Sequence, residues 1–129
     1  MREQPDGAAL LAIAREVLKN ELLPLLPKDS HYKVLMIANA MGIAARQLQA
    51  GDGPQAGEQA ALSALLDREG SLPELSREFA QQIRNGAADG NQAAQQLLWR
   101  ITEQRVRESA PKALRQLSVS PMDAPAALR

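Results

Sequence analysis

The 129-residue sequence contains no cysteine and only three aromatic residues, Tyr32, Phe79 and Trp99. Without cysteine there can be no disulfide, no thiolate metal site and no cysteine nucleophile. Three aromatic side chains are too few for the stacking platforms that bind single-stranded nucleic acid. The sequence also lacks an excess of either charge, because 15 basic residues balance 15 acidic ones. We therefore expect neither nucleic acid nor a membrane surface as a partner.

Long hydrophobic runs are missing as well. The longest stretch without a charged residue, 34–45, is well short of the ~20 apolar residues that span a bilayer. Charged residues interrupt the first apolar segment too early for a secretory leader, with Arg15 and Glu16 as examples. We therefore expect a cytoplasmic protein. β-branched residues are sparse and do not alternate, so strands are not expected either.

What the sequence does contain is helical periodicity, rich in Ala, Leu, Gln, Glu and Arg. Amphipathic helices are predicted over 7–23, 31–50, 58–70, 72–84 and 92–109. Short loops between such helices favour an all-α fold, an up-and-down helical bundle of four long helices plus a smaller fifth element. We expect residues 1–117 to form a single helical bundle domain and residues 118–129 a flexible C-terminal tail.

Several residues indicate where helices begin and end. Asp6 and Ser30 are placed to cap the first and second helices, and the spacing of Ser71 and Glu74 fits a capping box before the fourth. Gly51 stands where a C-terminal cap glycine belongs. Two prolines, Pro24 and Pro27, end the first helix, and the glycine-rich segment 51–57 is expected to be a loop.

The predicted helix 31–50 is apolar around most of its circumference, which favours a central, buried position. Gly42 lies inside it, four residues after Ala38 and on the same face. A glycine there either permits a close helix crossing or is merely tolerated, at a cost of ~1 kcal/mol relative to alanine.

Three polar residues, Tyr32, Asn39 and Arg46, are spaced by seven and form one line along this helix. The favoured interpretation is an internal polar network, in which Asn39 bridges two helices and Arg46 pairs with a carboxylate. The alternative is a ligand-binding cleft, in which Arg46 holds a carboxylate or phosphate and Tyr32 supplies a hydroxyl.

Two arginines of the last helix, Arg100 and Arg107, could join such a cleft. However, Glu103 lies between them at helical spacing, which fits a salt-bridged surface at least as well.

No catalytic set can be assembled. The single histidine, His31, follows Asp29 and Ser30, but adjacent residues at a helix start favour capping over a catalytic triad. The Ser-x-x-Lys pattern at 109–112 lacks its partner motifs. Neither a Glu-x-x-His metal motif nor a phosphate-binding loop occurs. We therefore predict no catalytic residues, no metal and no cofactor.

The segments "PDGAALLAIAREVLKNELLPLLP", "MIANAMGIAAR" and "QLQAG" resemble an uncharacterised bacterial family of small helical proteins. Its members are found beside or fused to aminoglycoside-phosphotransferase-like kinases and near acyl-CoA dehydrogenases. The resemblance covers about residues 4–115, but the last helix has "RVRESAPKAL" where a segment ending Asn-Pro-Arg-Tyr is expected. The residues that match the family pattern are Pro5, Asp6, Arg15, Glu16, Pro24, Tyr32, Asn39 and Arg46.

Together these features favour a non-catalytic accessory or interaction protein. The resemblance implies an aminoglycoside-phosphotransferase-like kinase or an acyl-CoA dehydrogenase as partner, and a homo-oligomer is also compatible. The alternative is a small-ligand-binding protein with an anion or acyl pocket between helices, lined by Tyr32, Asn39 and Arg46.

Overall fold

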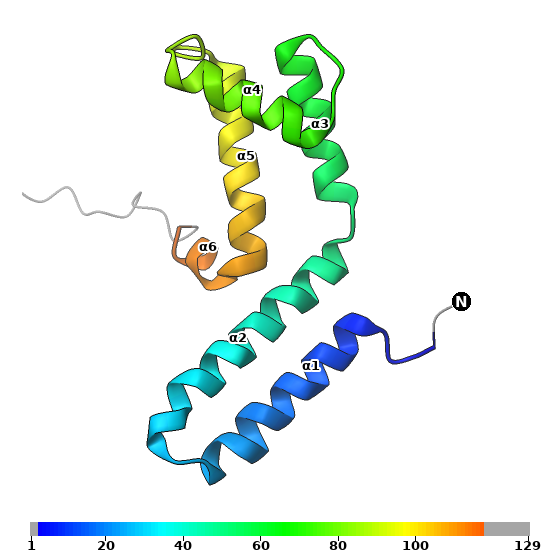
Figure 1. Cartoon of the computed structure of the whole chain (residues 1–129), viewed down its shortest axis with the longest axis vertical. Coiled ribbons are helices and arrows are strands. Elements are labelled where there is room, and N and C mark those ends of the chain that lie inside the picture. The colour runs from blue at the N-terminus through cyan, green and yellow to red at the C-terminus, as the bar shows by residue number, and fades with distance from the viewer. Residues whose placement is uncertain (1–2, 118–129) are drawn as a thin grey trace, which may run out of the picture. The chain divides into compact units, whose positions relative to one another are not determined.

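The computed structural model describes residues 3–117, which are helical throughout apart from short connections and contain no strand. The predicted all-α class is therefore confirmed for this part of the chain (Figure 1). Its α-helices are α1 (Gly7–Val17), α2 (Lys28–Ala50), α3 (Gly53–Leu66), α4 (Leu72–Arg84), α5 (Gln92–Ser109) and α6 (Pro111–Leu117). Within residues 3–117, no helix combines the length and apolarity needed to cross a membrane.

The chain divides into two compact units, Met1–Ala56 and Gly57–Arg129. The single domain over 1–117 and the up-and-down arrangement of four long helices stay predictions. The predicted tail, 118–129, lies outside the described residues.

The first unit is a helical hairpin of α1 and α2. As predicted, the Asp6 carboxylate caps α1 by accepting a hydrogen bond of 2.9 Å from the Ala9 backbone N–H. After Val17 the chain continues as a π turn, Leu18–Leu22, and a 3₁₀ turn, Leu23–Leu25. Pro24 lies in the 3₁₀ turn, where its missing N–H costs nothing.

Two expectations about α2 are settled by its ends. Ser30 does not cap it: α2 begins at Lys28, with Pro27 before it and no side-chain cap. Because Pro27 already fixes a turn-compatible backbone, the helix starts two residues before the predicted capping residue. At the other end Gly51 adopts a positive φ of 62° and its N–H donates to the Gln47 carbonyl, which confirms the predicted cap.

The seam between α1 and α2 is narrow and built from small residues. Ala8 of α1 is buried, as are four residues of α2 at helical spacing: Val34, Ala38, Gly42 and Ala45. The prediction that this helix is buried around most of its circumference is wrong, because Leu35, Met36, Ile37 and Leu48 are exposed. Within the first unit, α1 is the one neighbouring helix, and it covers only one face of the apolar α2.

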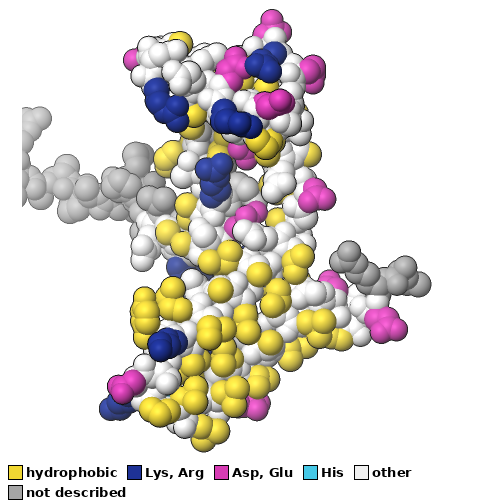
Figure 2. All heavy atoms as spheres, viewed as in Figure 1, with side chains coloured by type: hydrophobic (Ala, Val, Ile, Leu, Met, Phe, Trp, Pro, Cys, Tyr) yellow, Lys and Arg dark blue, Asp and Glu magenta, His cyan; other side chains and the backbone are white. Residues whose placement is uncertain are grey.

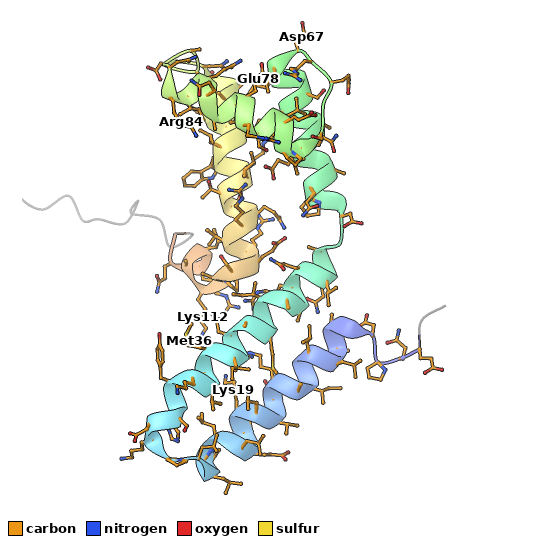
Figure 3. All side chains as sticks on the ribbon, viewed as in Figure 1. Lys19, Met36, Asp67, Glu78, Arg84 and Lys112 are labelled. Carbon is orange, nitrogen blue, oxygen red and sulfur yellow. The ribbon has the colours of Figure 1, made fainter. Side chains whose placement is uncertain are left out.

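The second unit has the larger core. Its buried residues come from three successive helices and touch one another: Leu62 of α3, Leu75 and Phe79 of α4, and Ala94 and Leu97 of α5. The predicted capping box is present, because the Ser71 hydroxyl accepts from the Glu74 N–H and the Glu74 carboxylate accepts from the Ser71 N–H. Arg68 pairs with Glu78, which projects from α4 (Figure 3).

One connection differs from the predictions. The segment 51–57 is not a loop, because α3 already begins at Gly53, and Pro54 is tolerated in the first turn of a helix. Pro111 starts α6, and a proline is tolerated there for the same reason. The predicted range of α5, in contrast, matches the structure at both ends.

Candidate functional site: the α1–α2 hairpin

One long side chain crosses the hairpin seam. Arg15 of α1 donates from Nε to the backbone carbonyl of Ala38 in α2 over 3.0 Å. A Cβ placed on Gly42 would lie 3.4 Å from this Nε and also 3.4 Å from Nη1 of Arg46. The guanidinium groups of Arg15, from α1, and of Arg46, from α2, therefore meet beside Gly42. Nε of Arg15 and Nη1 of Arg46 are no further apart than twice 3.4 Å.

The convergence concentrates positive charge at one point of the first unit. Both arginines are half-buried, and the Glu16 carboxylate lies 3.9 Å from Nη1 of Arg15, a weak ion pair on the surface. Guanidinium groups bind carboxylates and phosphates through paired hydrogen bonds, so such a pair has the chemistry of an anion site.

The three residues predicted to line a site are placed differently from one another. Tyr32 is 73% exposed and Asn39 is exposed, whereas Arg46 is half-buried beside Gly42. The favoured internal polar network is wrong for Asn39, because an exposed amide needs no buried partner. The ligand-binding role of Tyr32, Asn39 and Arg46 stays a prediction.

Arg107 lies in the second unit and pairs with Glu103 across 3.0 Å, as the spacing predicted. His31 is engaged locally, with its Nε2 2.9 Å from the Leu26 carbonyl oxygen. The described residues contain no group of three or more His, Asp or Glu side chains placed to hold a metal ion.

The second feature of the hairpin is an uncovered apolar surface, here called the hairpin face. It combines a stripe on α1 with a stripe on α2, the neighbouring helix of the hairpin. At one end of the stripes, a Cβ on Gly7, three residues before Leu10, would lie 3.4 Å from Cδ1 of Leu48. The stripes consist of Leu10, Ala14 and Val17 on α1 and of Ile37, Met41, Ala44 and Leu48 on α2.

Three large members of this face are open to solvent, whereas Met41 and Ala44 are half-buried. Leu10 is 54% exposed, Ile37 50% and Leu48 55%. None of the seven positions carries a charge. Figure 2 shows apolar side chains spread over both helices of the hairpin on the side turned to the viewer. Contiguous apolar surface of this kind marks an interaction site in soluble proteins, whereas single exposed apolar residues need no explanation.

Comparison with known proteins gives a family. The family described as Domain of unknown function (DUF6285) matches residues 24–113, more than half of the chain. The chain belongs to this family. No curated protein and no solved structure matches this chain.

The DUF6285 match bears differently on the two features of the hairpin. It includes α2 and with it Arg46, Gly42 and one stripe of the hairpin face, but it begins after α1 and so leaves out Arg15. The match confirms the resemblance to an uncharacterised family, whereas the neighbouring kinases and dehydrogenases stay a prediction.

Sequence reasoning missed the part that α1 plays in both features. Arg15 was singled out only by the resemblance, although it lies between Leu11 and Leu18 on an otherwise apolar side of the helix, which is unusual for a charged residue. The hairpin face was missed because its α2 stripe was assigned to the core, while Leu10 and Val17 of α1 were assigned no role. The spacing of both stripes was visible in the sequence, but what covers them is not encoded in either helix alone.

Proposed function

We propose that this DUF6285 protein is a non-catalytic accessory protein that works by binding another protein chain through the hairpin face. The observation that carries the proposal is the contiguous, uncharged and solvent-exposed surface shared by α1 and α2. A two-helix hairpin whose seam consists mainly of alanine, glycine and valine buries little apolar area, so covering the outer face stabilises it.

The resemblance suggests the partner. The resembled family is found beside aminoglycoside-phosphotransferase-like kinases and near acyl-CoA dehydrogenases. The proposed partner is therefore an enzyme of one of these classes, and the proposed location is the bacterial cytoplasm. The up-and-down arrangement of this chain's own four long helices also belongs to the proposal, and the all-helical make-up of residues 3–117 supports it.

The test is purification of the tagged full chain from its native lysate, with identification of what accompanies it. We expect a kinase-like or acyl-CoA dehydrogenase protein with the natural chain and with Met36→Glu, and its loss with Ile37→Glu. Both residues are 50% exposed on α2, but only Ile37 belongs to the hairpin face. Failure to find either enzyme class in repeated purifications would contradict the proposed partner.

A second candidate function is supported by the arginine pair at Gly42. In this alternative the chain binds a small carboxylate or phosphate, including the phosphates of an acyl-CoA, between Arg15 and Arg46. Tyr32 and Asn39 would contribute from the same helix as Arg46.

Thermal unfolding with inorganic phosphate, pyrophosphate, carboxylic acids and acyl-CoAs tests this candidate, since a ligand that binds the native state raises the unfolding temperature. Arg15→Gln and Asn39→Leu should each abolish the shift. Arg77→Gln is the matched control, because Nε of Arg77 also donates to a backbone carbonyl, that of Pro73, but in the second unit. A shift that survives Arg15→Gln, or none with any compound, would rule the candidate out.

A further inference from the structure

We infer that the chain which covers the hairpin face is a second copy of this protein, and that two hairpins form a four-helix bundle. This rests on the proposed function only in taking the hairpin face as an interaction surface. It assigns the hairpin face to a second copy, whereas the proposed function assigns it to an enzyme of one of two classes.

The spacing of the two stripes fits a helical bundle. On α2 the stripe advances by four, three and four residues, from Ile37 to Leu48, and on α1 by four and three, from Leu10 to Val17. Alternating steps of three and four residues keep one narrow side of a helix turned to its partners and are typical of left-handed bundles. The hairpin seam uses other residues, so each helix has one stripe for its own hairpin and a second stripe that is free.

The size distribution along the stripes also fits. Large residues stand at both ends of the hairpin face, Leu10 with Leu48 and Val17 with Ile37, and Met41 lies between them together with two alanines, Ala14 and Ala44. A mixture of large and small residues lets the side chains of facing helices interdigitate, as a packed bundle requires. A face that is contiguous and uncharged can pack against its own copy in a two-fold interface, because no like charges are then opposed.

The area agrees with what a stable dimer needs. A half-exposed Leu or Ile presents roughly 100 Å² of surface, so the hairpin face with its exposed border residues, Ile13 and Leu22, offers on the order of 600 Å² per copy. Specific protein interfaces bury about 600–1,000 Å² on each partner.

The first experiment measures the mass of the full chain in solution by sedimentation equilibrium across a dilution series. We expect a dimer for the natural sequence and for Met36→Glu, and a monomer for Ile37→Glu. Circular dichroism checks that each variant keeps its helices. A monomer for the natural chain overturns the inference, as does a dimer that Ile37→Glu leaves unchanged.

A second experiment avoids destabilising substitutions. Because the sequence has no cysteine, one introduced thiol is the only one in each chain. Ala14→Cys and Ala44→Cys, oxidised alone and as a mixture, should yield a disulfide-linked dimer in at least one of the three samples. Ala12→Cys, exposed on α1 outside the hairpin face, should not. Equal yields from all variants, or none from Ala14→Cys and Ala44→Cys, would contradict the inference.

The outcomes separate this inference from the proposed function. A monomer that still purifies with a kinase-like or dehydrogenase partner overturns the second copy and leaves the accessory role standing. A dimer that purifies with neither enzyme class supports the inference and contradicts the proposed partner. A monomer whose hairpin face is covered by its own second unit overturns the inference.

Discussion

Gly42 lies where the side chains of Arg15 and Arg46 meet in the hairpin. Its missing Cβ leaves room beside the Ala38 carbonyl, and the side chains of Arg15 and Arg46 line that room. The three atoms nearest the Cβ position lie at 3.4, 3.4 and 3.7 Å and all belong to these two side chains, so the arginines and not the α1 backbone come closest to the glycine. A methyl group would meet the two arginines at 3.4 Å, an ordinary contact distance.

Substitution of Gly42 therefore has two different expected outcomes. Gly42→Ala should leave stability unchanged or raise it by up to about 1 kcal/mol, because alanine is the better helix former. Gly42→Leu should displace Arg15 from Ala38 and destabilise the hairpin by about 1–3 kcal/mol. Chemical denaturation of the two variants gives the comparison. Equal destabilisation by both would show that the backbones, not the arginines, limit the space at this position.

Glu74 links stability to pH. Hydrogen bonds from the Ser71 backbone N–H and then from the Ser71 hydroxyl hold the pKa of this carboxyl below its ordinary value of 4.5. A group whose pKa is lowered by folding stabilises the native state fully above its unfolded pKa, and this contribution is lost as the pH falls through the folded pKa.

We therefore expect the unfolding temperature to fall as the pH drops below about 4.5, and to fall less steeply in Glu74→Gln, which cannot ionise. The measurement is thermal unfolding between neutral pH and the acid limit of solubility. The natural chain and Glu74→Gln must differ in slope below that pH; parallel curves would mean that the carboxylate contributes nothing as an ion.

At the scale of helices, the two units differ in how they bury apolar residues. The first unit has a seam of small side chains, whereas the second has the large residues Leu62, Leu75 and Phe79 in mutual contact. Stability within a single chain should therefore be higher in the second unit, because each large buried side chain contributes about 1.5–3 kcal/mol.

Leu75 is the most deeply buried of these residues, at 0% exposure, and lies between neighbours from α3 and α5. Leu75→Ala should cost about 2–5 kcal/mol, from the lost burial and the cavity left behind. Leu98→Ala, on the more exposed side of α5, should cost well under half as much. Denaturant unfolding of both variants checks this, and similar losses from the two would contradict the assigned core.

The helix ends could be predicted from the sequence wherever capping is local. The caps at Asp6, at Gly51 and at the Ser71–Glu74 pair each involve residues no more than four positions apart. Spacing in the sequence was therefore sufficient to predict these helix ends. The starts of α2 and α3 were predicted too late, at Ser30 and after the segment 51–57. A proline just before the first turn or inside it allows each helix to start earlier than its polar residues suggest.

Burial could not be predicted in the same way. The stripe from Ile37 to Leu48 and the seam from Val34 to Ala45 have similar apolar spacing, yet only the seam is covered by α1. The candidate site shows the same limit: Arg46 and Gly42 lie on one helix and could be related from the sequence, whereas Arg15 reaches them across the hairpin.

At the scale of the whole molecule, the α1–α2 hairpin carries both candidate features, the paired arginines and the hairpin face, and the second unit carries the larger core. Leu10, Ile37 and Leu48 are half-exposed on one face of the hairpin. An apolar surface of this kind is typical of a site that another molecule covers. The central claim is that another protein chain covers the hairpin face.

The measurement that tests this claim most directly is oxidative footprinting of the hairpin face as the protein is diluted. Ile37 and Leu48 should be protected at high concentration and become reactive on dilution, while Tyr32, which is 73% exposed and outside the face, reacts throughout. Reactivity of Ile37 and Leu48 that does not change with concentration, even when an enzyme of the proposed partner classes is added, would contradict the claim.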